Sequence, residues 1–304
     1  MGERLHPGAR FRQVLAEPGC AIAVGAHDPT IAKLVEEAGF PVCYVSGSAS
    51  SSCVGGFPDV GLLTLTELVA NVRHIINATG LPALCDADTG YGNVTNVRRT
   101  IREFESAGAA GVHLEDQTFP KRCGQTDGAS CIPTAEMLAK IYAAKEAQRS
   151  DDFVLVVRTD ARQCEGLDAV VERSRAYVAA GADVIFPEAL LSAEEFRRAR
   201  CEIDAPLVID VPEWGRSPTM TIDELEDWGF DLGIFAISTL RIALGSVRRF
   251  LAGLTETRTQ AAWLEEMMTR AEMDDLLGLT EIRDDEERLA RLSAQSAAGS
   301  ATRS

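Results

Sequence analysis

The chain has 304 residues, of which 46% are hydrophobic and 25% are charged, a balance typical of a globular protein. Its 46 acidic residues outnumber its 30 lysines and arginines, which gives a net charge of −16. Such acidity argues against nucleic acid or an anionic membrane as a general partner. Residues 1–19 are polar and mixed in charge, and no apolar run approaches the length of a membrane span, so we expect a cytoplasmic protein.

Short apolar runs alternate with amphipathic segments along most of the chain. The runs predict strands at 21–24, 42–46, 83–86, 111–115, 154–158, 184–187, 207–210 and 233–237. The segments predict helices near 29–38, 64–78, 94–108, 134–149, 167–180, 192–201, 221–228 and 239–254. Thr64, Thr134 and Thr221 stand at helix starts with an acidic residue following, the spacing of a helix cap.

Eight strands, each followed by a helix, indicate an α/β fold of the (β/α)8 TIM barrel type. The main alternative is a doubly wound open sheet. We favour the barrel because the count reaches eight and no GxGxxG motif follows the first strand. We expect the barrel over residues 1–255, a C-terminal helical extension over 256–293, and a disordered tail rich in Ser, Ala and Gly over 294–304.

Segment 117–133 is too long for an ordinary connection between a strand and a helix, and it contains Gly124 and Gly128. We therefore predict a loop that closes over a ligand. Lys121 and Arg122 precede Cys123 in this loop, and adjacent cations lower the pKa of a thiol, so thiolate chemistry is one interpretation. The other is a cysteine without a chemical role.

The eight cysteines are scattered along the chain without the spacing of a zinc site. Cys43 and Cys85 lie inside apolar runs. This pattern favours reduced thiols over a disulfide framework. A single disulfide between Cys123 and Cys131, across one loop, is the alternative.

Asp86 and Asp88 follow the apolar run 81–85 and precede two glycines. Residues i and i+2 of a strand point to one face, so both carboxylates would converge at the strand's end. Two like charges that close need a cation, and hard oxygen ligands favour Mg2+. The alternative is that Asp88 caps a loop while Asp86 is solvated.

The other predicted strands also end in polar side chains, at the edge where TIM barrels place their active sites. These ends carry Ser46-Gly47-Ser48, Asp86 with Asp88, Glu115-Asp116, Arg158 with Asp160, Glu188 and Asp210. Several acids at one mouth are costly without a divalent cation, which favours the metal interpretation. Arg158 is either a fork for a substrate carboxylate or an ion-pair partner of Glu188 or Asp160. His113, inside a strand, is expected to be a core or supporting residue.

Together these motifs resemble the isocitrate lyase and phosphoenolpyruvate mutase superfamily, and within it the 2-methylisocitrate lyases and carboxyphosphonoenolpyruvate mutases. The resemblance covers residues 8–290 in order. It is carried by Tyr44-Val45-Ser46-Gly47-Ser48, Gly56-Phe57-Pro58-Asp59, Asp86-Ala87-Asp88-Thr89-Gly90-Tyr91-Gly92, His113-Leu114-Glu115-Asp116-Gln117, Lys121-Arg122-Cys123-Gly124, Arg158-Thr159-Asp160-Ala161, Phe186-Pro187-Glu188-Ala189 and Thr269-Arg270.

The resemblance implies a barrel whose eighth helix is exchanged between the subunits of a homotetramer, with a small-molecule carboxylate as substrate. It implies Mg2+, with Mn2+ as an alternative, bound mainly by Asp86 with help from Asp88, Asp59 and Glu115. The implied catalytic residues are Cys123, Arg158 and Glu188, and the implied substrate-binding residues are Ser46, Gly47, Ser48, Gly124, Asp210, Arg241 and Arg270. Cys123 would protonate the departing carbon.

Three positions depart from the lyases of this superfamily. Gln125 follows Gly124 where the lyases have histidine, and glutamine can carry neither a proton nor a charge. Asp210 and Pro212 stand where methylisocitrate lyases bind a carboxylate through Asn and Thr; aspartate repels a carboxylate, and proline has no donor. We therefore expect methylisocitrate itself to be a poor substrate.

The leading functional hypothesis is an Mg2+-dependent carbon–carbon lyase acting on a 2-hydroxy or 2-oxo carboxylic acid through an enolate-type intermediate, with altered substrate specificity. The alternatives within the superfamily are a phosphonate mutase or hydrolase and an oxaloacetate-type decarboxylase or hydrolase. An alternative of another class is a catalytically weakened binding or assembly subunit. The retained Lys121-Arg122-Cys123-Gly124 favours the lyase.

Overall fold

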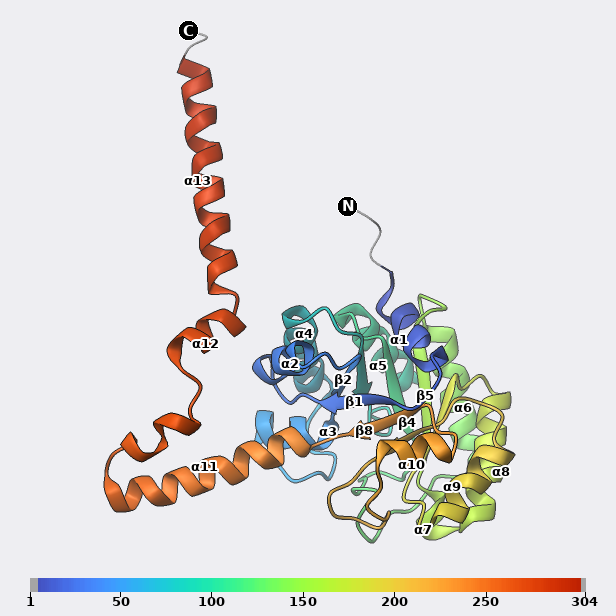
Figure 1. The fold of residues 1–304 in the computed structure, drawn as a ribbon. Helices are drawn as coiled ribbons and strands as arrows, with labels where there is room; N and C mark the ends of the chain where they lie inside the picture. The colour runs from blue at the N-terminus through green and yellow to red at the C-terminus, as the bar shows by residue number, and fades with distance from the viewer. Residues whose placement is uncertain (1–4, 302–304) are drawn as a thin grey trace. The chain divides into compact units, whose positions relative to one another are not determined.

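The computed structural model describes residues 5–301 and divides the chain into two compact units, Met1–Leu244 and Gly245–Ser304 (Figure 1). The division falls inside helix α11 (Ser238–Thr257). Our predicted boundary after residue 255 would keep almost the whole of this helix with the barrel. Each unit is described separately below.

The first unit is built on eight parallel strands. These are β1 (Ala21–Gly25), β2 (Val42–Val45), β3 (Ala83–Asp86), β4 (Gly111–Glu115), β5 (Val154–Thr159), β6 (Val184–Pro187), β7 (Val208–Asp210) and β8 (Leu232–Phe235). Their order in the sheet is β6-β5-β4-β3-β2-β1-β8-β7, and a bridge between Ile185 and Leu207 brings the two end strands together. The predicted TIM barrel is therefore confirmed.

Helices connect consecutive strands, as a parallel barrel requires. The predicted helices correspond to α2 (Pro29–Glu37), α4 (Leu65–Ala78), α5 (Val94–Ala107), α6 (Thr134–Ala147), α8 (Leu167–Ala179), α9 (Ala193–Glu202), α10 (Ile222–Asp227) and α11. The prediction did not include α1 (Pro7–Ala16), α3 (Gly47–Ser50), the π-helical turn η1 (Ser51–Gly55) or α7 (Ala161–Cys164). The short elements α3, η1 and α7 are too brief to show an apolar period.

Local sequence explains where several helices begin and end. Thr64 and Thr221 each form a capping box with the glutamate three residues later, as predicted. The prediction for Thr134 is wrong, because Thr134 is the first residue of α6 and the preceding Pro133 offers no side-chain bond. Gly108 ends α5 with a φ of +93°, a left-handed conformation that favours glycine.

The barrel interior is apolar almost to its carboxyl end. Every residue of β2, β3, β4 and β6 is buried. Large buried side chains such as Phe104, Phe153 and Phe196 come from the shell of helices and loops around the sheet. Burying this surface stabilises the barrel and fixes the strand ends that carry the polar residues.

The second unit contains the end of α11, the 3-10 turn η2 (Ala261–Glu266), α12 (Arg270–Leu276) and α13 (Leu279–Ala301). Phe250 packs edge-on against Trp263 at 5.7 Å between ring centroids. We predicted a disordered tail from residue 294, whereas α13 continues to Ala301, and the alanines of this stretch favour a helix. Residues 302–304 of the predicted tail lie outside the described residues.

Within residues 5–301, no helix is both long enough and apolar enough to cross a membrane.

Candidate active site

A cavity of about 120 Å3 lies in the barrel unit, at the carboxyl ends of the strands. Its lining includes the predicted site residues Ser46, Ser48, Asp59, Asp86, Cys123, Gly124, Arg158, Glu188, Asp210 and Arg241. Tyr44, Lys121, Gln125, Phe186 and Trp214, which we did not assign to the site, line it as well. The fold therefore brings most of the predicted residues to one place.

Asp86, at the end of β3, is fixed by a buried network. Its Oδ2 accepts a hydrogen bond from Gly47 N at 3.0 Å, and its Oδ1 accepts one from Asp88 N at 2.9 Å. His113 Nε2 lies 3.1 Å from Asp86 Oδ1 and 2.7 Å from the Tyr44 hydroxyl. The expectation that His113 is a supporting residue is confirmed.

The environment keeps Asp86 ionised. Burial alone raises the pKa of this carboxyl, but the attraction of His113 and Lys121 outweighs burial and lowers the pKa below its ordinary value. Gly47 permits the close approach, because a Cβ there would lie 2.8 Å from Asp86 Oδ2. Gly47 thus acts through its backbone, beneath the cavity lining.

Lys121 lies in the middle of the acidic cluster, whereas we had predicted for it only the role of a neighbour to Cys123. Its Nζ lies 2.5 Å from Asp59 Oδ1 and 2.9 Å from Asp88 Oδ1. Burial alone lowers the pKa of Lys121, but the carboxylates around it, Asp88 first, raise the pKa well above its ordinary value. Asp88 adopts a φ of +45°, a strained backbone typical of functional sites.

The carboxylates carry more charge than one ammonium can balance. Burial raises the pKa of Asp88, and repulsion by Asp86 adds to the shift although Lys121 opposes it. Burial also raises the pKa of Glu115 well above its ordinary value, and Glu115 Oε1 is buried without a hydrogen-bond partner. An all-oxygen donor set with surplus negative charge fits a hard divalent cation such as Mg2+.

Arg158, on β5, forms the ion pairs of one sequence interpretation, and its role as a fork for a substrate carboxylate stays a prediction. Its guanidinium donates two hydrogen bonds to Asp160, at 3.0 and 2.9 Å, and lies 3.5 Å from Glu188 Oε2. Burial alone lowers its pKa, but Asp160 and then Glu188 raise it well above the ordinary value. Arg158 is therefore a fixed cation that is also part of the cavity wall.

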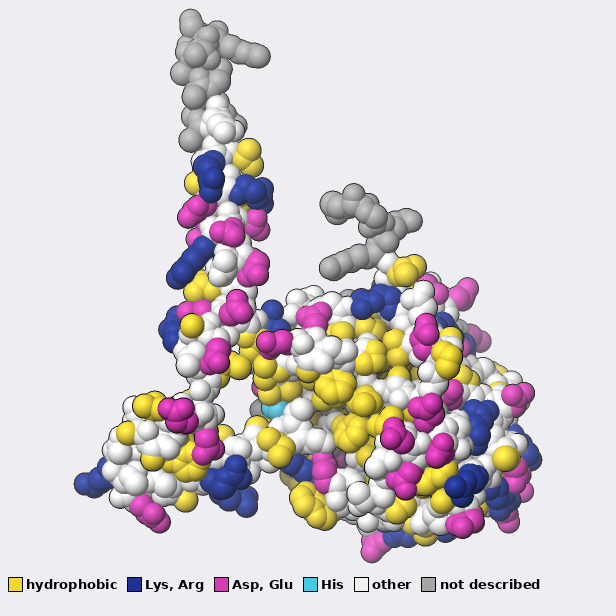
Figure 2. Space-filling view, in the orientation of Figure 1, with side chains coloured by type: hydrophobic (Ala, Val, Ile, Leu, Met, Phe, Trp, Pro, Cys, Tyr) yellow, Lys and Arg dark blue, Asp and Glu magenta, His cyan; other side chains and the backbone are white. Residues whose placement is uncertain are grey.

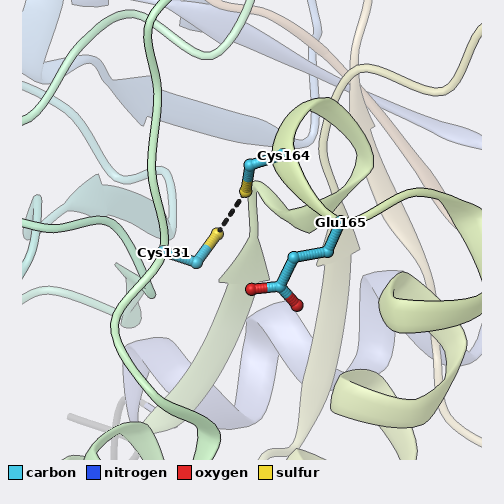
Figure 3. A group of neighbouring side chains, drawn as sticks. All are labelled: Cys131, Cys164 and Glu165. Atoms are coloured by element: carbon cyan, nitrogen blue, oxygen red, sulfur yellow. Dashed lines mark hydrogen bonds between the residues drawn. The ribbon is translucent and has the colours of Figure 1, made fainter.

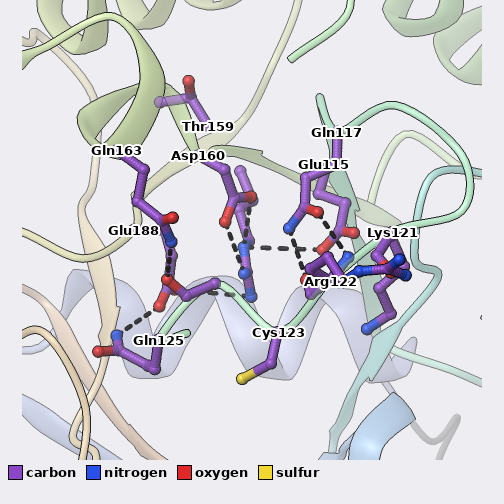
Figure 4. Close-up of polar contacts among 12 residues, drawn as sticks. Glu115, Gln117, Lys121, Arg122, Cys123, Gln125, Thr159, Asp160, Gln163 and Glu188 are labelled. Carbon is purple, nitrogen blue, oxygen red and sulfur yellow. Dashed lines mark hydrogen bonds and ion pairs between the residues drawn. The ribbon is translucent and has the colours of Figure 1, made fainter. Parts of the chain in front are cut away.

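Cys123 lies in the loop 117–133 and lines the same cavity (Figure 4). The prediction that its pKa is lowered by adjacent cations is wrong: burial raises it. The reason is that Lys121 turns to Asp59 and Asp88, so the nearest cation that counteracts the rise is Arg158. A thiol that keeps its proton is suited to donating it.

Gln125 fastens this loop over the cavity, a role that the sequence did not indicate. Its Nε2 donates to Glu188 Oε1, and its Oε1 accepts from Arg216 N at 2.9 Å and Ser217 N at 3.2 Å. Gly215 makes room, since a Cβ there would lie 2.5 Å from Gln125 Oε1. Gln125 thus joins the loop after β4 to the loop after β7.

A second tie holds the other side of the loop. Gln163, in α7, donates from Nε2 to the carbonyl of Gly124. The loop therefore covers the cavity and is bonded to both of its flanks. This closed arrangement agrees with the predicted role of segment 117–133.

The β7–β8 side of the cavity holds Asp210, Pro212, Glu213, Trp214 and Arg241. Arg241 pairs with Glu213 at 2.7 Å and its guanidinium lies 5.3 Å from the centre of the Trp214 ring. Burial raises the pKa of Asp210 well above its ordinary value, and repulsion by Glu188 adds to the shift. The objection that Asp210 repels a carboxylate therefore applies only above this raised pKa.

Arg270 belongs to the C-terminal unit, at the start of α12. Its Nε donates to Asp274 at 2.8 Å, and its side chain is 84% exposed. Its assignment to the substrate site stays a prediction.

Comparison with known proteins places the chain in a family. The family model described as phosphoenolpyruvate phosphomutase matches residues 11–255. The chain is 45% identical over 268 residues to a probable 2-methylisocitrate lyase of Corynebacterium glutamicum, covering 88% of each chain. It is 39% identical over 286 residues to the 2,3-dimethylmalate lyase of Eubacterium barkeri, covering 94% of this chain and 99% of the relative.

A solved structure agrees with these relationships. A phosphonopyruvate hydrolase, in complex with oxalate and Mg2+, superposes with a TM-score of 0.84 and 28% identity, over 93% of this chain and 99% of that one. Fold and sequence thus point to the same group of enzymes. The chain belongs to the phosphoenolpyruvate phosphomutase family, within the phosphoenolpyruvate mutase and isocitrate lyase superfamily.

Proposed function

We propose that the protein is an Mg2+-dependent carbon–carbon lyase that cleaves a 2-hydroxy carboxylic acid and releases a 2-oxo acid. The observation that carries this proposal is the meeting of Asp86, Arg158 and a half-buried Cys123 thiol in one cavity. Such cleavage needs a place for charge on oxygen and an acid for the departing carbon, and the cavity offers both. The lyase relatives support this reaction class.

Different residues of the cavity would bind the substrate carboxylate and transfer the protons. Ser46, Ser48 and Arg158 line the cavity and would bind the carboxylate next to the hydroxyl-bearing carbon. Burial raises the pKa of Glu188, although Arg158 opposes the shift, so Glu188 is suited to accepting the hydroxyl proton. Cys123 would then pass its S–H proton to the carbon that departs.

Asp86, Asp88, Asp59 and Glu115 would hold the cation. When bound, Mg2+ supplies positive charge beside the oxygen that becomes the carbonyl of the 2-oxo acid. The raised pKa values of Asp88 and Glu115 show that negative charge is unfavourable at these positions without a cation, which supports this assignment, as does the Mg2+ in the related phosphonopyruvate hydrolase complex. Mn2+, which accepts similar ligands, is an alternative.

We propose a substrate with two carboxylates, of the 2,3-dimethylmalate type, rather than a tricarboxylate. Compared with 2,3-dimethylmalate, 2-methylisocitrate carries one more carboxylate. Pro212 offers no donor for that group, and Asp210 adds negative charge once it ionises. The expectation that methylisocitrate is a poor substrate rests on these two residues.

The other functions in the superfamily are phosphonate chemistry and hydrolysis or decarboxylation of an oxaloacetate-type acid. The structural similarity to phosphonopyruvate hydrolase supports phosphonate chemistry as an alternative. The position of Cys123 in the cavity favours the lyase, because cleavage of a carbon–carbon bond creates a carbanion that needs a proton. The intact acidic cluster argues against a binding subunit that has lost its activity.

We further propose a homotetramer in which α11 is exchanged between subunits. Apolar side chains of this helix are exposed, among them Ile242, Leu244, Val247 and Leu251. Figure 2 also shows apolar side chains gathered on one face of the barrel unit. Light scattering during size-exclusion chromatography measures the molar mass in solution and tests the proposed tetramer. A cytoplasmic location stays a prediction.

The test of the reaction is a substrate screen with Mg2+. Oxo acids, phosphonates and the two methylated hydroxy acids are each incubated with the protein and with Cys123→Ser. Turnover that is lost in the variant supports the lyase, and turnover that persists points to phosphonate or decarboxylase chemistry. No turnover and no bound Mg2+ supports the binding subunit instead.

A further inference from the structure

Two cysteines outside the cavity lie almost in bonding contact. The Cys164 thiol donates to the sulfur of Cys131 with 3.4 Å between the two Sγ atoms (Figure 3). Cys131 ends the loop 117–133 and is partly buried, whereas Cys164 is the last residue of α7 and is exposed. Both are free thiols, and the reaction proposed above uses neither of them.

A metal is one reading of this pair, because Glu165 places a carboxylate near both thiols. The contacts oppose it. Arg173 holds Glu165 with two hydrogen bonds, at 2.6 and 2.8 Å, and the Cys131 thiol faces Asp116 Oδ1 at 3.4 Å. A cation would have to displace a guanidinium and still find a fourth ligand.

We propose that Cys131 and Cys164 form a reversible disulfide that fastens the loop 117–133 to α7. A disulfide needs a sulfur–sulfur distance of about 2.05 Å, so the two atoms must approach by little more than 1 Å. The exposed position of Cys164 lets an oxidant in solution reach one partner directly.

The chemistry requires a small disulfide, such as oxidised glutathione. The Cys164 thiolate attacks one sulfur of that molecule, forms a mixed disulfide and releases one small thiol. Cys131 then attacks the Cys164 sulfur and releases the second small thiol. The two protein thiols lose two electrons to the small disulfide, and their two protons leave on the released thiols.

The loop's own contacts explain why this bond would matter. Cys131 is bridged to Gln117, and Thr118 N donates to Ser130 O at 2.8 Å, so the two ends of the loop are joined. Next to Cys164, Gln163 bonds the Gly124 carbonyl beside Cys123. A disulfide adds a covalent tie to a loop that is already bonded closed.

The expected consequence is slower opening of the cavity, and hence slower exchange of substrate and product. This part of the inference rests on the proposed function, since it is measured as turnover. Formation of the disulfide and slowing of the loop do not depend on which reaction the enzyme performs.

The experiment equilibrates the full-length protein with mixtures of oxidised and reduced glutathione. Thiols are then blocked, and linked peptides are identified by mass spectrometry. Hydrogen exchange of peptides from 117–131 and turnover are measured on the same samples. Cys131→Ser and Cys164→Ser remove the pair, and Cys201→Ser removes an exposed thiol elsewhere.

We expect a peptide linking Cys131 to Cys164, restored to two thiols by dithiothreitol. Oxidised protein should exchange hydrogen more slowly in the loop and lose most of its turnover, while both pair variants keep theirs. Cys201→Ser should respond as the wild type does. Slower loop exchange without any measurable turnover would support the disulfide and count against the proposed reaction.

Three results would overturn the inference. One is glutathione held on Cys164 without a linked peptide. Another is a linked peptide with unchanged loop exchange and turnover. The third is stoichiometric zinc that protects both thiols from oxidation and is lost in either variant.

Discussion

The two sides of the cavity are built differently. On the β2–β4 side, Asp86 is held by Gly47, Asp88 and His113, and all of these groups are buried. On the β7–β8 side, Asp210 faces the cavity, and no ion pair links it to another described residue. The first side is held by these contacts, whereas Asp210 has no ion pair of this kind. We therefore expect the first side to hold the cation and the second to select the substrate.

The largest expected effect on the β2–β4 side of the cavity is that of Asp86→Asn. The substitution removes a negative charge from the carboxylates that would hold the cation, and it disturbs the contact with His113. We therefore expect Mg2+ binding and turnover to fall to background. Isothermal titration with Mg2+ and a turnover assay check both effects. Asp204→Asn, at an exposed position, should change neither.

Cys123→Ser tests the acid of the same reaction. Serine is a much weaker acid than cysteine, so turnover should fall by about 10^2–10^4-fold, the usual contribution of general acid catalysis. Mg2+ binding should stay unchanged, because the thiol is not among the carboxylates of the cluster. Loss of Mg2+ binding in this variant would show that the loop, and not the thiol alone, had been disturbed. Cys201→Ser serves as the matched control.

Asp210→Asn addresses the other side of the cavity. At a pH above the raised pKa of Asp210, the amide removes the repulsion and can donate to a third carboxylate, so kcat/KM for 2-methylisocitrate should rise by about tenfold, equivalent to about 1.4 kcal/mol. The value for 2,3-dimethylmalate should change much less. An equal change for both substrates would contradict the assignment of specificity to this side.

The pH dependence of turnover by the wild type also tests whether Asp210 selects the substrate. The pKa of Asp210 is raised by burial, so lowering the pH through that pKa neutralises the carboxyl. Turnover of 2-methylisocitrate, relative to 2,3-dimethylmalate, should therefore increase as the pH falls. This increase should disappear in Asp210→Asn, whose side chain does not titrate. A ratio that is independent of pH in the wild type would argue that Asp210 does not meet the third carboxylate.

The smallest expected effect is that of Gln125→Ala. Water replaces part of these hydrogen bonds when the loop opens, so we expect their combined loss to cost about 1 kcal/mol and kcat/KM to fall by about fivefold. The peptide 117–131 should exchange hydrogen faster than in the wild type. Gln13→Ala makes the same change of side chain at an exposed position of α1 and is the control.

The sequence alone predicted the architecture because strands and helices repeat with a clear period. It also predicted most of the cavity, since Asp86, Arg158 and Glu188 lie at or next to strand ends and a parallel barrel gathers such ends. Lys121 could not be placed in this way. Its position depends on how a long loop folds back onto Asp59 and Asp88, and no local pattern encodes that path.

Other roles were hidden for the same reason. Gln125 contacts residues from two distant loops, and its function is visible only after those loops are placed. The pair Cys131 and Cys164 is separated by the whole of α6 and β5, so spacing alone does not bring the two sulfurs together. For the pKa of Cys123, the adjacent cations suggested a lowered value. Burial instead raises it, because the side chain of Lys121 turns to Asp59 and Asp88.

The central claim is that Cys123 protonates a carbon released by carbon–carbon cleavage. The direct measurement is NMR of 2,3-dimethylmalate incubated with the protein and Mg2+ in deuterium oxide. For the wild type we expect pyruvate together with propionate that carries one deuterium on the carbon from which pyruvate was cleaved. With Cys123→Ser, or after chelation of the metal, we expect neither product. Deuterated propionate formed at an unchanged rate by Cys123→Ser would contradict it, as would turnover of phosphonopyruvate without any cleavage of the hydroxy acid.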